Sequence, residues 1–235
     1  MIRLFNIYNQ SIIELSNHTH ILINTLNAHC FNMALLDDLY MESLINCDIL
    51  LPDGISIVWA IKLLTGTKIK KIAGADLFLY EMERLQKSDG KCFFLGSTEK
   101  TLIKIKNRIA KEYPNIKVET YSPSYKPKFT PEENALMLEA INKFQPDVLM
   151  IGMTAPKQEK WAYQHYNLLQ VGHICCIGAV FDFYSNTINR APKWMVRIGL
   201  EWFYRLTREP RRMWSRYSVG NFKFIYSVIK EKLFV

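Results

Sequence analysis

The chain has 235 residues, of which 49% are hydrophobic, and its formal net charge at pH 7 is +8. This length can bury a core without disulfide bonds or a structural metal, and it fits one domain with or without an appendage. No stretch of about 18 consecutive apolar residues is present, and the N-terminal segment lacks the regions of a signal peptide, so we expect a cytoplasmic protein without a transmembrane helix.

Short apolar runs predict six buried β-strands, at residues 20–27, 47–53, 91–96, 117–122, 147–152 and 173–183. Stretches of helical period lie between them, at residues 32–45, 56–64, 99–111, 132–144 and 158–169. Thr130 and Pro131 suit the N-cap and first turn of the fourth helix. Continuously apolar strands separated by helices indicate a parallel sheet covered on both faces. We therefore predict an α/β protein, with a single Rossmann-like domain of about six strands over residues 1–189.

Polar residues follow the first two predicted strands at their carboxyl ends, where open α/β sheets bind ligands. Thr25 and Asn27 end the first run, and Asp53 followed by Gly54 ends the second. A carboxylate at this position can act as a general base when it is oriented and desolvated. An Asp-Gly pair is also common in turns, so a purely structural interpretation stays open.

The later strands end in similar positions. After Gly152, Pro156 suits the first turn of a helix. The free N–H groups of that turn would point toward a diphosphate, and Gln158 would add a side-chain amide. An ordinary capped helix start is the alternative. Asp182 belongs to the last predicted strand and can bind a ribose or sugar hydroxyl. Small-residue turns follow at Gly96 and at residues 74–76. Together, these strand ends favour a nucleotide-type site.

Several motifs are absent from the sequence. It contains no GxGxxG, no GxxxxGK[ST] and no Asp-x-Asp, so neither a dinucleotide fingerprint, a P-loop nor a metal clamp is predicted. The five cysteines lack CxxC or zinc-site spacing and are interpreted as buried, reduced thiols. A diphosphate bound without metal would need another source of positive charge, such as bidentate arginine side chains.

Residues 190–235 carry the whole net charge, with eleven basic and three acidic residues against nineteen of each elsewhere. Met195, Ile198, Trp202 and Leu206 recur at helical spacing in this segment. A basic amphipathic segment with tryptophan predicts binding to an anionic membrane surface. RNA binding and a core-packing helix pair with solvated charges are the alternatives. We expect a helical, basic C-terminal appendage whose arginines can also neutralise a diphosphate.

These features, with further motifs, resemble one family. The motifs are Thr25-x-Asn27, Pro52-Asp53-Gly54, Gly74-Ala75-Asp76-Leu77, Pro156-Lys157-Gln158-Glu159-x-Trp161, Arg190-Ala191-Pro192, Gly199-Leu200-Glu201-Trp202-x-Tyr204-Arg205-Leu206 and Glu209-Pro210-x-Arg212. In this order, from about residue 20 to residue 217, they are similar to the WecG/TagA/CpsF family, glycosyltransferase family 26.

The resemblance implies an inverting transferase at the inner face of the plasma membrane. Family members move N-acetylmannosamine, its uronic acid or glucose from UDP onto an undecaprenyl-diphosphate-linked sugar, for teichoic acid, common antigen, capsule or exopolysaccharide. No cofactor, essential metal or nucleic acid partner is expected, and a homo-oligomer is compatible with this interpretation. A non-catalytic module that binds nucleotide sugars or lipid phosphates is the alternative.

The resemblance also implies roles for individual residues. Asp53 looks like the general base, and Thr25 looks like its catalytic neighbour. Lys71 stands where the family often has arginine, and it lacks the fork for a bidentate phosphate contact. The expected donor-binding residues are Asn27, Gly96, Gly152, Pro156, Gln158 and Asp182. The expected diphosphate- or lipid-binding residues are Lys71, Arg190, Arg205, Arg208, Arg212 and Arg216.

Overall fold

The computed structural model describes residues 1–17, 19–188, 191–192, 194–195, 200–208, 210, 214 and 219–234, with only the backbone at residues 16, 17, 201 and 205. Its centre is a sheet of six strands in the order β2-β1-β6-β5-β3-β4, and all neighbouring strands run parallel. This confirms the predicted α/β class. The strands are β1 (Ile21–Leu26), β2 (Ile49–Pro52), β3 (Lys91–Gly96), β4 (Lys117–Tyr121), β5 (Val148–Gly152) and β6 (His173–Cys176).

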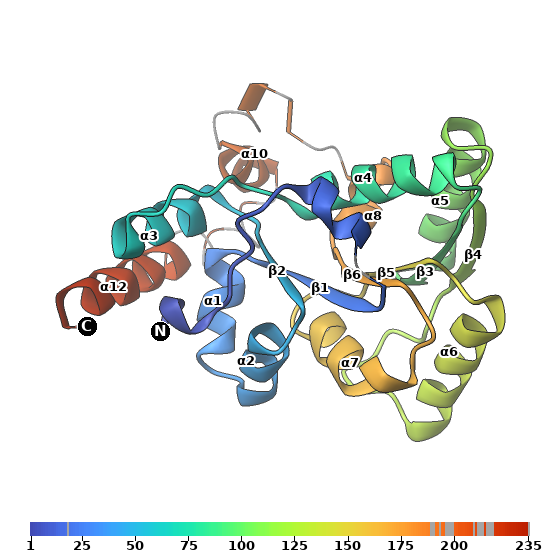
Figure 1. Ribbon diagram of the computed structural model, residues 1–235, viewed down its shortest axis with the longest axis horizontal. Helices are drawn as coiled ribbons and strands as arrows, with labels where there is room; N and C mark the ends of the chain where they lie inside the picture. Colours follow the sequence, from blue (N-terminus) through green and yellow to red (C-terminus); the bar gives the residue numbers. More distant parts are fainter. Residues whose placement is uncertain are drawn as a thin grey trace.

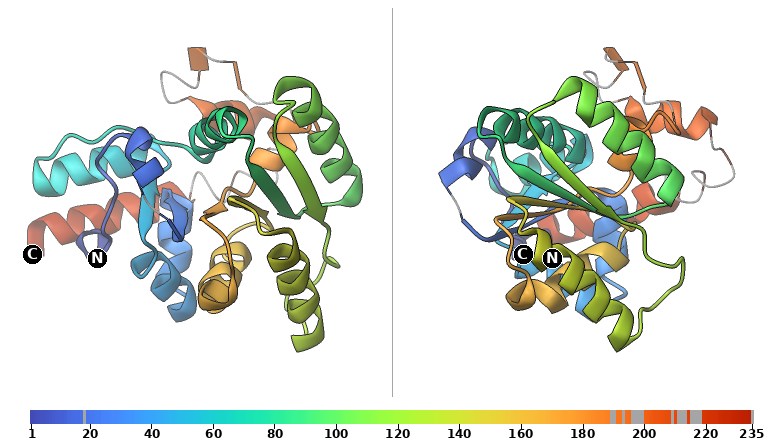
Figure 2. Two further views of the ribbon diagram at one scale, coloured as in Figure 1. Left: turned by 45° about the vertical axis from the view of Figure 1, so that its right-hand side comes forward. Right: turned by 90° about the vertical axis from the view of Figure 1, so that its right-hand side faces the viewer.

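Helices cover both faces of the sheet (Figure 1). One face packs against α4 (Gly74–Lys87), α5 (Glu99–Glu112) and α8 (Val180–Tyr184). The other face packs against α6 (Pro131–Phe144) and α7 (Lys157–His165), with α2 (Asp38–Ile45) beside α7. Figure 2 shows these layers from two further directions. Successive side chains of each strand point to opposite faces of the sheet, so each strand contributes side chains to both helix layers.

A third cluster of buried residues lies beside β1 and β2 and joins α1 (Ala28–Ala34), α3 (Ile55–Thr65) and α12 (Val219–Phe234). The rings of Phe31 and Phe224 meet edge to face there, with centroids 5.3 Å apart. Glu231 of α12 accepts backbone hydrogen bonds from Ile2 at 2.7 Å and Arg3 at 3.1 Å. The end of the basic segment is therefore packed on the α/β body, and the domain boundary near residue 190 stays a prediction. None of the described helices is long and apolar enough to cross a membrane.

Several predicted element boundaries are confirmed. α5 and α6 begin and end within one residue of the predicted helices, and Thr130 caps α6 by accepting a hydrogen bond from the backbone of Glu133 at 3.3 Å. Glu133 in turn accepts from the Thr130 backbone at 2.8 Å, which completes a reciprocal capping box. All six strands overlap their predicted positions. The cysteines are free thiols, and all except the half-buried Cys47 are buried.

Other boundaries were wrong. The single helix predicted over residues 32–45 is two helices, because Asp37 caps a new helix by accepting from the backbone of Tyr40 at 3.0 Å. The turn expected at residues 74–76 is the start of α4, where Asp76 accepts from the backbone of Ala73 at 2.8 Å. The helix predicted over residues 158–169 ends as α7 at residue 165 and continues as the short 3-10 helix η3 (Tyr166–Leu168). Two further 3-10 helices, η1 (Ile2–Leu4) and η2 (Ile12–Asn17), precede β1.

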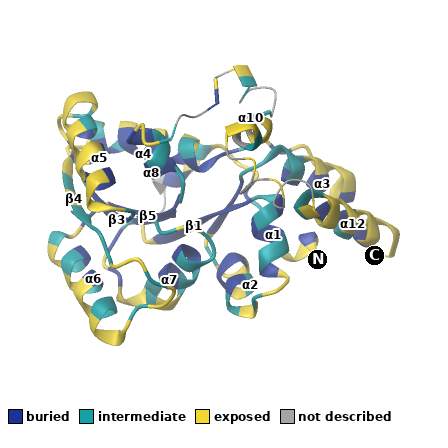
Figure 3. Ribbon diagram, turned by 180° about the vertical axis from the view of Figure 1, so that it is seen from behind, coloured by how far each residue is buried: buried dark blue, intermediate teal, exposed yellow. Residues whose placement is uncertain are grey.

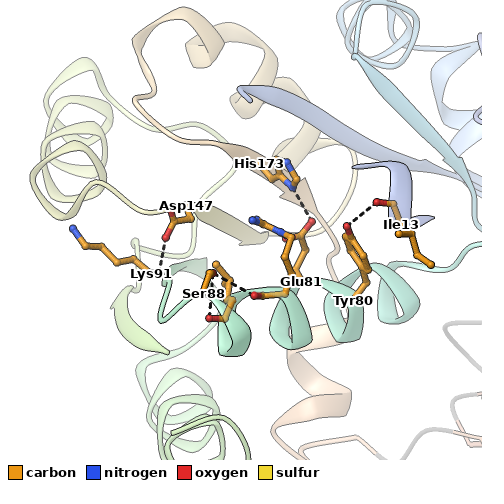
Figure 4. A network of polar contacts seen from close by, with 9 residues as sticks. Ile13, Tyr80, Glu81, Ser88, Lys91, Asp147 and His173 are labelled. Carbon is orange, nitrogen blue, oxygen red and sulfur yellow. Dashed lines mark hydrogen bonds and ion pairs between the residues drawn. The ribbon is translucent and has the colours of Figure 1, made fainter. Parts of the chain in front are cut away.

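A network of polar contacts, of which the one between His173 and Glu81 is buried, lies at the amino-terminal edge of the sheet (Figure 4). His173 Nδ1 on β6 lies 2.7 Å from Glu81 Oε1 on α4, and Arg84 donates to the other Glu81 oxygen at 2.8 Å. Lys91 starts β3, and its backbone N–H donates to Asp147 Oδ2 at 2.7 Å. These contacts tie helices and strands together at the edge opposite the predicted site.

Candidate active site

A cavity with a volume of about 800 Å³ opens at the carboxyl ends of β1 and β2, beside the first turn of α7. The residues that line it come from segments far apart along the chain. This location agrees with the rule that ligands bind at the carboxyl edge of a parallel sheet. Five predicted site residues line the cavity together: Thr25, Asn27, Asp53, Lys71 and Gln158.

The same cavity has an apolar side. Trp59 and Leu63 from α3 line it, together with Ile225 and Ile229 from α12. Trp202 reaches it from α10 (Glu201–Arg208), a helix of the C-terminal segment. The cavity therefore joins polar strand ends to a mostly apolar wall.

Asp53 follows β2 directly and is held beside the end of β1. Its backbone N–H lies 2.9 Å from the carbonyl oxygen of Leu26 and 3.0 Å from that of Leu51. Gly54 then turns the chain into α3 with a φ of 155°, which a residue with a side chain rarely adopts. The chain bends at Gly54, and this bend leaves Asp53 at the cavity wall.

Asn27 has a structural role in addition to lining the cavity. Its Oδ1 accepts hydrogen bonds from the backbone of His29 at 3.0 Å and Cys30 at 3.1 Å, and so caps α1. Asparagine is among the preferred N-cap residues, so this role could have been predicted from the helical period that follows it. The donor contact assigned to Asn27 stays a prediction.

Gln158 and Glu159 lie in the first turn of α7 and are almost fully buried, with 3% and 1% of their surface exposed. Gln158 Oε1 accepts a hydrogen bond from the backbone of Met153 at 3.2 Å, and Gln158 Nε2 donates to Glu159 Oε1 at 2.9 Å. Both polar atoms of the amide therefore make contacts inside the protein. Gln158 holds the loop that leads from β5 to α7, and its donor contact stays a prediction.

Glu159 is a second carboxyl group at the cavity, and sequence reasoning assigned it no role. Its Oε2 is buried and has no hydrogen-bond partner among the described residues, and the same is true of the Tyr40 hydroxyl. Burial raises the pKa of Glu159 to about 7, although the hydrogen bond from Gln158 acts in the opposite direction. A carboxyl group of this kind exchanges its proton near neutral pH. Only its burial reveals this property, and burial depends on tertiary packing.

The first backbone N–H groups of α7 were expected to be free, but they make hydrogen bonds within the protein. The backbone N–H groups of Lys157 and Gln158 both bond to the carbonyl oxygen of Thr154, at 3.1 and 3.2 Å. The Lys157 ammonium group donates to the carbonyl oxygen of Lys126. Pro156 is the N-cap residue of α7 and does not line the cavity. Internal contacts therefore occupy much of this predicted phosphate site.

Gly96 and Gly152 end β3 and β5 and lie outside the cavity lining. A Cβ atom at Gly96 would lie 2.6 Å from the carbonyl oxygen of Gly152. A Cβ atom at Gly152 would lie 2.6 Å from the ring of Phe181. These glycines therefore allow close packing between the strand ends and α8, whereas their predicted donor contacts stay untested.

Asp182 was expected at the end of a strand, and that placement was wrong. β6 ends at Cys176, and Gly178 turns the chain into α8 with a φ of 50°. The apolar run continues into α8 because this helix is itself buried, so apolar character alone could not locate the strand end. Asp182 is not among the residues that line the cavity, although Phe183 is.

Comparison with known proteins decides the family. The model of the glycosyl transferase WecG/TagA/CpsF family matches residues 5–235. The chain belongs to the WecG/TagA/CpsF family.

Three similar proteins are each named N-acetylglucosaminyldiphosphoundecaprenol N-acetyl-β-D-mannosaminyltransferase. The protein of this name from Bacillus subtilis strain 168 is 31% identical over 210 residues, which cover 89% of this chain and 79% of the relative. The one from Bacillus spizizenii W23 is 27% identical over 210 residues, with the same shares of both chains. The one from Staphylococcus aureus MW2 is 24% identical over 214 residues, covering 91% of this chain and 82% of the relative.

Of the arginines predicted to bind phosphate in this WecG/TagA/CpsF protein, Arg208 is fully described. It lies on α10 with its guanidinium carbon 5.5 Å from the ring centroid of Tyr204, and it does not line the cavity. Arg190, Arg212 and Arg216 lie outside the described residues, as does the side chain of Arg205. Their phosphate contacts stay predictions.

The described part of this WecG/TagA/CpsF chain contains no group of three His, Cys, Asp or Glu side chains that could hold a metal ion. The cation that does line the cavity is Lys71, close along the chain to the start of α4. The ammonium group of Lys71 is a compact positive charge, and Lys71 lines the same cavity as Asp53. The cavity is therefore lined by a carboxylate, a cation and an apolar wall.

Proposed function

We propose that this chain transfers an N-acetylmannosaminyl group from UDP to an N-acetylglucosaminyl group linked to undecaprenyl diphosphate. The observation that carries this proposal is the position of Asp53 on the wall of a cavity of about 800 Å³ at the carboxyl edge of the sheet. The activity for which the relatives are named supports the choice of sugar and acceptor.

Asp53 acts as the general base in the proposed reaction. It accepts the proton of the acceptor hydroxyl, whose oxygen forms a bond to the anomeric carbon of the donor sugar. The bond between that carbon and the β-phosphate oxygen breaks, and its electron pair leaves with UDP. A single displacement of this kind inverts the anomeric configuration. Lys71 and the arginines of residues 190–235 neutralise the departing diphosphate.

The proposal includes the place of the reaction and its independence of metal. The lipid-linked acceptor resides in a membrane, and the basic segment of residues 190–235 binds its anionic surface. Turnover in the presence of EDTA tests the second part, because positive side chains replace the metal clamp. A loss of turnover that Mg²⁺ restores would contradict metal independence.

The test of the base is Asp53→Asn, assayed by UDP release with UDP-N-acetylmannosamine and a short-chain polyprenyl-diphosphate-GlcNAc. We expect kcat to fall by about 10²–10⁴, the usual contribution of a general base, with UDP binding retained. Asp89→Asn is the matched control, since Asp89 is exposed and does not line the cavity. Near-normal turnover of Asp53→Asn would exclude the base assignment, and UDP binding without transfer by the wild type would favour a binding module.

A further inference from the structure

The apolar wall of the cavity continues outward along two helices. Trp59 and Leu63 of α3 are 67% and 50% exposed, and Ile225 and Ile229 of α12 are 51% and 47% exposed, yet all four line the cavity. Residues four positions apart lie on the same side of a helix, so each helix presents a short apolar stripe. We call these four residues the apolar groove.

The groove is not needed to hold the two helices in place. α3 is anchored by other residues on its buried side, such as Ile57 and Leu64, and α12 is anchored by Phe224 and Val228. The helices contact each other, and they lie side by side in Figures 1 and 2. Figure 3 colours residues on both helices as exposed. A contiguous exposed apolar surface of this kind marks a binding site.

The order of polar and apolar residues along the cavity indicates what binds there. Asp53 and Lys71 lie where β2 ends, because the backbone of Ile72 donates a hydrogen bond of 3.1 Å to the carbonyl oxygen of Pro52. The apolar groove of the same cavity lies further along α3 and on α12. The part of α12 that lines the cavity runs from Asn221 to Ile229, which corresponds to about 12 Å at 1.5 Å per residue. A head group at the strand ends would leave this length for a chain. An apolar chain that carries a polar diphosphate at one end matches this order. A protein partner could bind an apolar surface that is not connected to the cavity.

We propose that the apolar groove between α3 and α12 binds the part of the polyprenyl chain nearest the diphosphate of the acceptor. This inference rests on the proposed function, in which the acceptor is a polyprenyl diphosphate. The chain leaves the cavity between Trp59 and Ile225, so the acceptor hydroxyl reaches Asp53 while the distal lipid stays in the bilayer.

The experiment measures lipid binding without turnover. The probes are dansyl-labelled polyprenyl diphosphates of increasing chain length that carry no sugar, in buffer without detergent or vesicles, with affinity read by fluorescence anisotropy. For the wild type we expect affinity to rise with chain length until the groove is full. Ile225→Asp should weaken binding of the longest probe about tenfold, equivalent to roughly two buried methylene groups, and should flatten the chain-length dependence.

Ile103→Asp on α5 is the matched control. Ile103 is 53% exposed and does not line the cavity, so the change adds the same charge to an equally exposed isoleucine. Circular dichroism of both variants checks that they fold, and Leu63→Asp provides a second groove variant. Equal effects of Ile225→Asp and Ile103→Asp, or an affinity that does not depend on chain length, would overturn the proposal.

Other outcomes separate the groove from the proposed function. If long probes bind through Ile225 but no sugar is transferred to any acceptor, the function is wrong and the groove stands. If transfer occurs with a KM that is independent of chain length, the function stands and the groove is wrong. A dimer by sedimentation that Ile225→Asp dissociates, with unchanged probe binding, would identify a self-association surface instead. Loss of binding to anionic vesicles alone would identify a membrane contact.

Discussion

Gln158 Nε2 donates a hydrogen bond of 2.9 Å to Oε1 of its neighbour Glu159, and both side chains are buried at the cavity. Through its own Oε1, Gln158 also holds the backbone of Met153. The pair therefore connects a buried titratable group to the loop between β5 and α7, and burial couples the ionisation of Glu159 to the stability of the fold.

Glu159→Gln should change the dependence of stability on pH. The pKa of Glu159 is about 7 in the folded protein and 4.5 without burial, so folding favours its protonated form. This contribution is fully present below about pH 4.5 and is lost as the pH rises through about 7. Above that pH the glutamine variant should be more stable than the wild type, by about 3 kcal/mol for a shift of this size.

Urea unfolding of both proteins between about pH 4.5 and pH 8 measures this difference. The control is Glu119→Gln, a half-exposed carboxylate whose ion pair with Lys106 is 3.6 Å long, and it should show little change. A difference between Glu159→Gln and the wild type that does not vary with pH would show that Glu159 is ionised throughout the range.

Gly96→Ala should destabilise the fold at the junction of β3 and β5. The new Cβ would approach the carbonyl oxygen of Gly152 to 2.6 Å, in a residue with a φ of 113°. We expect a loss of about 1–3 kcal/mol or more, as for overpacked cores, measured by urea unfolding. Gly66→Ala separates the two causes, because Gly66 has a φ of 78° and no atom within 4 Å of its Cβ position. Equal losses in both variants would show that backbone conformation alone is responsible.

Glu81→Ala should lower stability without a specific effect on the cavity. The change leaves His173 and Arg84 without the buried carboxylate that they contact at 2.7 and 2.8 Å. Removing one partner of such a network costs about 3–5 kcal/mol, measured as a fall in the thermal midpoint and in urea stability. Below the unfolding transition, UDP binding should be normal. Glu83→Ala on the exposed side of α4 is the control, and an equal loss there would point to helix propensity instead.

Lys71→Gln should weaken binding of the nucleotide donor in the proposed reaction. Lys71 is the described cation that lines the cavity with Asp53, and a hydrogen bond to a charged group contributes about 1.5–3 kcal/mol. The KM for UDP-N-acetylmannosamine should rise about tenfold or more, and Lys71→Arg should restore it. Lys70→Gln, at an exposed neighbour outside the cavity, tests for a general charge effect. An unchanged KM in Lys71→Gln would place the diphosphate elsewhere.

Five of the six strands were predictable because each is a short apolar run whose two faces are both buried in the fold, whereas the edge strand β4 has no buried residue. The residues at their carboxyl ends were predictable for the same reason, and Asp53, Thr25 and Asn27 do line one cavity. Asp182 shows the limit of this reasoning. Val180, Phe181 and Tyr184 of its helix α8 are buried in the same core as the strands, so the hydrophobic pattern from residue 173 onward did not distinguish the helix from a strand.

The sequence by itself determined the α/β class, the six strands and the family, because hydrophobic runs and ordered motifs are local features of the sequence. Only the tertiary structure decided which side chains lose contact with water. Burial raised the pKa of Glu159, and packing against Phe181 explained Gly152. The position of α12 beside α3 formed the apolar side of the cavity. These properties depend on contacts between residues that are distant in the sequence, and the corresponding interaction energies exist only in the folded protein.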